Sequence, residues 1–314
     1  MEGGTRPGAG GGLRVFLALF AAAATIAALL FGVDYYRHRF VRSNADLVKL
    51  LPPGDLTIFF VDVAMLRQAN LLNLVTGIAP AAEKDYAEFV SQTQFDYTLD
   101  MDALAGASDG EQLFFVIRGR LRWDKLRQYA AAHGGACRDD YCKAPASMPG
   151  RWANFFPIQP DVIALAISRN SAAADLLRPP GRRVQEQPNG NPVWVRVAQS
   201  ALKTPSSLPL PLRIFAVILQ ATDSVVLSLG PPRSGQAVFS VQLDAGFPNE
   251  PSADTARTQF EIQTKMLKLE LAREHQQPNP ADLTGLLTAG SFQVVKRHVI
   301  GSWPVRKDLL SALQ

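Results

Sequence analysis

The segment "DLTIFFVDVAMLRQANLLNLV", residues 55 to 75, contains the pattern on which the fold prediction rests. The apolar, β-branched and aromatic run from Thr57 to Val61 predicts a buried strand, and the residues after it predict a helix. Asp62 stands between the two, where its carboxylate suits a helix N-cap. A catalytic acid is the alternative role, but no second carboxylate accompanies Asp62 at a spacing typical of acid–base chemistry. We therefore expect a strand, a capping aspartate and a helix in succession.

Short sequences in the first part of the chain recur in the second part in the same order. The matched pairs are "FVDVA" (60–64) with "WVRVA" (194–198), "GEQLFFV" (110–116) with "GQAVFSV" (235–241), and "AADLL" (173–177) with "RKDLL" (306–310). The offsets are 134, 125 and 133 residues. Nearly constant offsets indicate an internal repeat. We expect repeat 1 to cover residues 51–180 and repeat 2 to cover residues 190–314.

The spacing of elements in the second part predicts the fold class. "RIFAVILQ" (213–220), "SVVLSLG" (224–230) and "QAVFSVQLD" (236–244) read as strands joined by short turns, which is typical of antiparallel pairing. A long amphipathic helix is expected from Ser252, as N-cap, to His275. Helices do not alternate strictly with strands, which favours an α+β fold with a mainly antiparallel sheet over a doubly wound parallel one.

The N-terminal part predicts a membrane anchor. After a flexible Gly-rich tail over residues 1–14 comes an uncharged apolar run over residues 15–33. As a helix this run would be about 28 Å long, close to the thickness of the hydrocarbon core of a bilayer. A cleaved signal peptide is the rival interpretation, but the apolar run is longer than such peptides usually have. We expect a transmembrane helix with the lipid bilayer as its partner, followed by a short juxtamembrane helix within residues 34–50.

The charges that flank this run do not settle its orientation. Arg6 and Arg14 precede it, while Arg37, Arg39 and Arg42 follow it. The positive-inside rule on this count favours a cytoplasmic C-terminal domain, although a long domain tends to be translocated regardless of charge. The orientation therefore needs a second indicator.

The cysteines provide that indicator. "HGGACRDDYC" (133–142) holds both cysteines of the chain, Cys137 and Cys142. A disulfide between them would close a short polar loop and would place the domain in an oxidising, extracytoplasmic compartment. The alternatives are a zinc site in which His133 and Asp139 or Asp140 join the thiolates, a catalytic thiol, and two reduced thiols in the cytosol. His133 also has a simpler role, because it falls in the last turn of a helix that Gly134 would end.

The rest of the sequence shows no arrangement of residues that is typical of a catalytic or nucleotide-binding site. It lacks the G-x-S-x-G, H-E-x-x-H, G-x-x-x-x-G-K-[ST] and G-x-G-x-x-G patterns in a suitable context. The net charge of +4 is small and dispersed, which argues against a nucleic-acid partner. Lys296 and His298 are expected on the solvated face of one strand. We expect neither an enzyme, nor a cofactor, nor a metal site.

Two stretches carry a resemblance to known proteins. "LLPPGDLTIFFVDVAMLRQANLL" (50–72) and "CRDDYCKAPASMPGRWANFFPIQPDVIALAIS" (137–168) resemble a family of uncharacterised bacterial proteins with one N-terminal membrane helix. The resemblance implies an extracytoplasmic domain and brings no catalytic residues with it.

The expected function is non-catalytic. We expect a single-pass protein of the cell membrane whose domain outside the cytoplasm contains a disulfide and an internal repeat. Such a domain is expected to take part in protein interactions in the cell envelope. Binding of a lipid or a small hydrophobic molecule between the two repeats is the alternative. An enzyme without a recognisable motif is the third possibility.

Overall fold

A computed structural model describes residues 43–72, 84–178, 190–204, 210–230, 237–279 and 282–306. The predicted N-terminal tail and the predicted membrane helix at 15–33 lie outside these ranges. In the part of the chain that the structure describes, no helix is long and apolar enough to cross a bilayer. The described residues from Ser43 onward form one compact unit.

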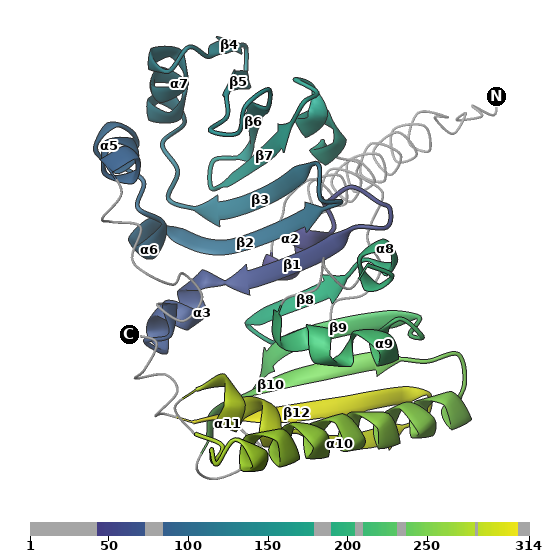
Figure 1. The fold of residues 1–314 in the computed structure, drawn as a ribbon. Coiled ribbons are helices and arrows are strands. Elements are labelled where there is room, and N and C mark those ends of the chain that lie inside the picture. The colour runs from purple at the N-terminus through teal and green to yellow at the C-terminus, as the bar shows by residue number, and fades with distance from the viewer. Residues whose placement is uncertain are drawn as a thin grey trace, which may run out of the picture. The chain divides into compact units, whose positions relative to one another are not determined.

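The described chain is organised around one antiparallel sheet of twelve strands (Figure 1). The strands are β1 (Thr57–Asp62), β2 (Met101–Ser108), β3 (Leu113–Gly119), β4 (Ala136–Arg138), β5 (Tyr141–Pro145), β6 (Trp152–Gln159), β7 (Val162–Ser168), β8 (Val193–Val197), β9 (Ser224–Gly230), β10 (Ala237–Gly246), β11 (Ser291–Val295) and β12 (His298–Arg306). Their order across the sheet is β11-β12-β10-β9-β8-β1-β2-β3-β7-β6-β5-β4. The predicted α+β class with antiparallel pairing is confirmed.

Helices connect these strands. They are α2 (Asn44–Val48), α3 (Val63–Gln68), α5 (Lys84–Thr93), α6 (Tyr97–Asp100), α7 (Trp123–Ala132), η2 (Ala173–Leu177), α8 (Gln199–Leu202), η4 (Leu210–Phe215), α9 (Ala216–Leu219), α10 (Glu250–Arg273) and α11 (Leu283–Thr288), where η marks a 3-10 helix. Of the predicted juxtamembrane helix, the described part is helical only over α2.

The strand order is the same on both sides of the central pair, β1 and β8. Outward from β1 it is β1-β2-β3-β7-β6, with the hairpin β5-β4 added at the end, and outward from β8 it is β8-β9-β10-β12-β11. We call residues 43–177 the first half and residues 193–306 the second half. Phe60 of β1 lies directly opposite Trp194 of β8, and their rings stack with centroids 6.1 Å apart. These two residues begin the matched sequences "FVDVA" and "WVRVA".

The two halves bury opposite faces of this common sheet. Directly opposed residues of antiparallel strands share a face, so the pairing register assigns every strand residue to one of two faces. We call the face that carries Phe60 and Trp194 face A, and the face that carries Phe59 and Val195 face B.

The first half packs face A. Ten of its face-A side chains are at most 6% exposed: Ile58, Phe60, Ala103, Ala105, Ala107, Phe114, Val116, Val162, Ala164 and Ala166. Alanines make up much of this face, and their small side chains let α2 pack closely on the sheet. Leu47 of α2 and Leu51, which follows α2, are fully buried. The side chain of Asn44 in α2 donates to Asp62 Oδ2 at 2.9 Å and accepts from Arg118 Nη1 at 3.1 Å.

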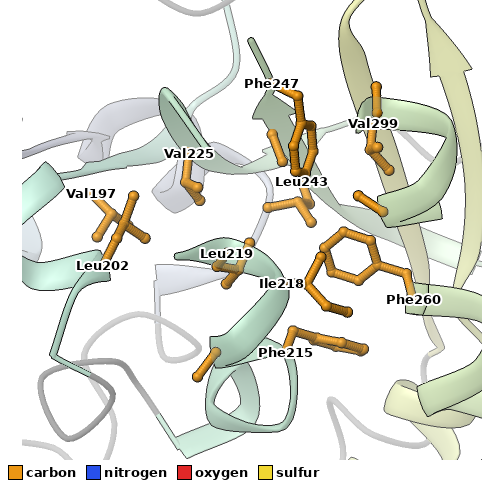
Figure 2. Close-up of a cluster of buried hydrophobic side chains, with 14 of the residues drawn as sticks. Val197, Leu202, Phe215, Ile218, Leu219, Val225, Leu243, Phe247, Phe260 and Val299 are labelled. Carbon is orange, nitrogen blue, oxygen red and sulfur yellow. The ribbon is translucent and has the colours of Figure 1, made fainter. Parts of the chain in front are cut away.

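The second half packs face B instead. Its face-B residues Leu243 and Val299 are fully buried beneath α9 and α10, together with Phe260 of α10 (Figure 2). Face A of this half is polar and partly exposed, with Arg196, Ser228, Gln242, Asp244 and His298 on it. Each half therefore has its own apolar core, and the two cores lie on opposite sides of the sheet.

Of two local predictions, the helix cap at Asp62 is confirmed and the strand at residues 213–220 is wrong. Asp62 is the N-cap of α3 as predicted, and its Oδ1 accepts from the Met65 N–H at 2.9 Å. The predicted strand "RIFAVILQ" is wrong, because these residues form the end of η4 and all of α9. A continuous apolar run does not distinguish a strand from a buried helix, and here Phe215, Ala216, Ile218 and Leu219 are buried with helical spacing.

The predicted start of the long helix is also wrong. The helix begins at Glu250, and Asn249 rather than Ser252 is its N-cap. Asn249 Oδ1 accepts from the Ser252 N–H at 2.9 Å. Pro251, which has no N–H to satisfy, fits the first turn of the helix.

Candidate functional site

The two cysteines form a disulfide, as predicted. Cys137 and Cys142 are directly opposed in the hairpin of β4 and β5, and their sulfurs are bonded. The turn between the strands is Asp139–Asp140, and Asp139 has the positive φ, 52°, that tight hairpin turns need. Bonded sulfurs are not thiolate ligands, and no group of metal-binding side chains occurs in the described ranges.

His133 does not take part in this hairpin. It caps the C-terminus of α7, as the sequence predicts, and Gly134 follows with a φ of 75°. The His133 ring stacks on Tyr129 with a centroid distance of 4.0 Å, and its Nε2 lies 3.5 Å from Glu88. These contacts give the histidine a structural role at the end of α7.

His298 occupies a different setting from the one expected. Lys296 lies in the turn between β11 and β12 rather than in one strand with His298, so the prediction of a shared strand face is wrong. His298 Nδ1 lies 2.6 Å from Asp244 Oδ1, and the two side chains are 34% and 45% exposed. This pair could not be predicted from the sequence, because the two residues are 54 positions apart. Because both side chains are this exposed, we interpret the contact between His298 and Asp244 as a solvated surface pair without a functional role.

A broad set of apolar side chains lies on face B, across the boundary of the two halves. Thirteen side chains on seven adjacent strands share this face and are partly exposed. They are Phe59, Val61, Leu104, Leu113, Phe115, Ile117, Leu165, Ile167, Val193, Val195, Leu227, Leu229 and Val241. We call this set the open face. Seven strands at about 4.8 Å spacing give it a width of about 29 Å.

A glycine shapes the middle of the open face. Gly106 in β2 lies between Phe59 of β1 and Phe115 of β3 in the pairing register. A Cβ at this position would lie 2.1 Å from Phe59 Cζ, so the Phe59 ring covers the glycine. The Phe59 and Phe115 rings meet edge to face with centroids 6.1 Å apart. Close packing of the two aromatic rings at the centre of the open face thus depends on the missing side chain.

A separate groove lies between α9 and the first turns of α10. Its volume is about 550 Å³, and its lining residues are Val217, Ile218, Ala221, Phe247, Pro248, Pro251, Ser252, Thr255, Ala256 and Gln259. None of these side chains is charged. Val217 at the rim is 82% exposed, an unusual exposure for a valine. Because Asn249 caps the Ser252 N–H and Pro251 has none, the adjoining helix terminus is poorly suited to an anion.

The contact between the halves is reinforced by a cap. Asp55 precedes β1, and its carboxylate accepts from the N–H groups of Gln199 at 2.6 Å and Ser200 at 2.8 Å, at the start of α8. Partial burial acts to raise the pKa of Asp55, but these hydrogen bonds outweigh it and the pKa lies below its usual value. A residue of the first half therefore caps a helix of the second.

At α2, burial likewise acts to raise the pKa of Asp46. Hydrogen bonds from Lys49 and Ser43 outweigh that effect and lower the pKa to about 2. The first turn of α2 is thus held by an ionised carboxylate.

Comparison with known proteins yields only distant structural likeness. No family model matches the chain, and no curated protein matches it. The solved structure of TP0453 in crystal form I has a TM-score of 0.47 and 10% sequence identity, covering 86% of this chain and 97% of that chain. Crystal form IV of TP0453 has a TM-score of 0.40 and 11% identity, covering 85% of this chain and 95% of that one. A likeness this distant supports no inference about function.

Proposed function

We propose that this chain is a single-pass membrane protein whose extracytoplasmic domain binds another protein of the cell envelope through the open face. The observation that carries the proposal is the row of thirteen partly exposed apolar side chains on face B. Contiguous apolar patches that remain partly exposed on a folded domain are typical of interaction sites. The anchor at residues 15–33 and the Cys137–Cys142 disulfide support the membrane location and the oxidising compartment.

The shape of the surface favours a protein partner. Small-molecule sites are concave and enclose most of their ligand, whereas the open face is the side of a sheet about 29 Å across. Its centre is aromatic, with Phe59 and Phe115 in contact. Aromatic side chains are enriched at the centres of protein interfaces.

The first described helix lies on the other side of the sheet. α2 packs on face A, where Asn44 contacts Asp62 and Arg118. It therefore leaves the open face, on face B, accessible to a partner.

We further propose that the two halves descend from one duplicated unit, a version of the predicted tandem repeat. The identical strand order outward from β1 and from β8 supports it, as does the opposition of Phe60 and Trp194 in equivalent positions of the matched sequences. Two antiparallel copies joined edge to edge would create a wide sheet of this kind.

Site-specific photo-crosslinking in intact cells tests the proposed interaction. A benzoyl-phenylalanine in place of Phe115 on the open face should give a reproducible crosslinked adduct with one partner. The matched control is the same probe in place of Trp152, an aromatic side chain that is also partly exposed but lies on face A. Equal adducts from both positions, or none from Phe115, would contradict the proposal.

The groove between α9 and α10 favours a second candidate function, the binding of a small uncharged apolar molecule. Its volume and uncharged lining match the usual size and character of ligand pockets. Thr255→Trp should fill the groove and remove an apolar compound from organic extracts of the purified chain. Thr258→Trp, on the same helix but outside the lining, should leave the extract unchanged. Identical extracts from the two variants would refute this candidate.

A further inference from the structure

The two outer strands of the sheet differ in how well they are protected against pairing with another strand. At one end is β4, a three-residue strand tied into its hairpin by the disulfide and followed by Asp139–Asp140. At the other end is β11, whose sequence "SFQVV" contains no charge and no proline. In the described part of the chain, β11 pairs only with β12. Natural proteins usually protect an edge strand with charges, prolines or short length, and β11 has neither charge nor proline.

From this contrast we propose that β11 is a homodimer interface, at which it pairs antiparallel with β11 of a second copy of the chain. A twofold axis at Gln293 pairs the whole strand, and any shifted register shortens the ladder. Phe292 then lies opposite Val294 of the second copy on face B, and Ser291 lies opposite Val295 of the second copy on face A. The faces of these residues follow from their pairing with β12.

Charge favours the antiparallel direction. In this register Lys296, just after β11, lies opposite Gly290 of the second copy, and Arg297 lies opposite Ala289. A parallel pair in register would place each Lys296 beside the other Lys296, and like charges directly opposed are destabilising.

The helix beneath the strand supports the same arrangement. Phe260 of α10 stacks on Phe292 of β11 with centroids 5.0 Å apart, so α10 lies beside the edge of the sheet. With α10 under β11 and β12, the α10 helices of the two copies would be about two strand spacings apart, roughly 10 Å, which is a usual distance for packed helices.

The flank of α10 away from the α9 groove carries complementary charge. It presents Asp254 and Glu261, with Arg257 ion-paired to both, in its first half, which is net negative, and Lys265 and Lys268 in its second half, which is net positive. The twofold axis reverses the helix direction, so the acidic part of each flank faces the basic part of the other. Opposite charges arranged in this way fix the register of an interface.

The symmetry gives both copies the same orientation. A twofold axis perpendicular to the sheet keeps face A on the same side in both copies, so both α2 helices lie on that side of the dimer.

Cysteine crosslinking of the full-length chain in native membranes tests the axis directly. Gln293→Cys should form a disulfide-linked dimer under mild oxidation, because directly opposed residues have Cα atoms about 4.5–5.5 Å apart, within disulfide range. Ser291→Cys alone and Val295→Cys alone should stay monomeric on the gel, since each is about 13 Å from its own counterpart. Co-expression of the last two variants should restore the crosslink. Failure of Gln293→Cys to crosslink, or equal self-crosslinking at all three positions, would overturn the proposal.

A charge on the edge provides an independent readout. Val295 is 50% exposed, so Val295→Lys should fold normally and weaken dimerisation at least tenfold, measured by native mass spectrometry of the full-length chain in detergent. The matched control is Ala136→Lys at one of the two exposed residues of β4, which should leave the dimer unchanged. A monomeric wild-type chain, or equal effects of the two lysines, would refute the interface. The Phe115 photo-crosslink tests the open face separately, so either proposal can fail alone.

Discussion

The two halves of the sheet share one strand order but bury opposite faces, and the difference follows from their helices. In the second half α10 is 24 residues long and covers face B. In the first half the corresponding helix, α7, has only 10 residues and packs beside the added hairpin of β4 and β5. The short α2 and η2 cover face A there instead, which leaves the open face on face B. Helix length and placement, rather than strand order, decide which side of a common sheet becomes the core.

The largest expected effect concerns the core of the second half. Phe260→Ala should lower the free energy of unfolding by about 3–5 kcal/mol, because the fully buried ring contacts Phe215 and Phe292. Urea denaturation followed by tryptophan fluorescence measures it. Met266→Ala, at an exposed position of the same helix, should change stability by no more than about 0.5 kcal/mol. Similar values for the two variants would mean that α10 does not cover a core.

The matching test in the first half concerns the segment after α2. Leu51→Ala should cost about 2–5 kcal/mol, because Leu51 is fully buried. The same denaturation experiment measures it. Lys49→Ala, which removes only an exposed ion pair with Asp46, should cost less than about 1 kcal/mol. If Leu51→Ala were as mild as Lys49→Ala, α2 would not belong to the core of the first half.

A comparison of two neighbouring phenylalanines sharpens the contrast between the faces. Phe114 lies on face A and is 2% exposed, whereas Phe115 lies on the open face and is partly exposed. Phe114→Ala should cost about 3–5 kcal/mol, and Phe115→Ala should cost clearly less, about 1–2 kcal/mol. Thermal unfolding of the two single variants provides the test. Equal losses would show that face B of the first half is as buried as face A.

The smallest expected effect is at the cap that joins the halves. Asp55→Ala should cost about 1 kcal/mol at pH 7, since it removes the side chain that accepts from the Gln199 and Ser200 N–H groups. The pKa of Asp55 is lowered in the folded chain, so its contribution is present above the unfolded pKa and is lost as the pH falls through the folded pKa. The stability difference between wild type and variant should therefore begin to shrink below about pH 4 and vanish only when the pH is below the lowered pKa of the folded chain. A difference that persisted at low pH would assign the effect to something other than the ionised carboxylate.

Local features of the fold could be predicted from the sequence. The strand Thr57–Asp62, the cap at Asp62, the end of α7 at His133 and the disulfide each depend on a few adjacent residues with strong preferences. The antiparallel pairing of β9 with β10 could be predicted for the same reason, because a short connection joins the two strands.

Features that depend on distant contacts could not be predicted. Residues 214–219 are apolar throughout, and the packing of Phe215 against Phe260 and Trp303 places them in a buried helix rather than a strand. The pair of His298 and Asp244 joins strands that the sequence separates by a long helix. The open face could not be predicted for a similar reason. Its apolar residues have the pattern of core residues, and only the position of the covering helices shows that they are partly exposed. The membrane anchor, the extracytoplasmic location and the family resemblance stay predictions.

Hydroxyl-radical footprinting tests the open face most directly, with the purified full-length chain compared with the same chain in intact cells. The account predicts that Phe59 and Phe115 are oxidised in the purified chain and protected in cells, where the partner is present. Phe114, on face A of the same strand as Phe115, should be protected in both. If Phe59 and Phe115 were as unreactive as Phe114 in the purified chain, or equally reactive in both settings, the open face would not be a binding surface.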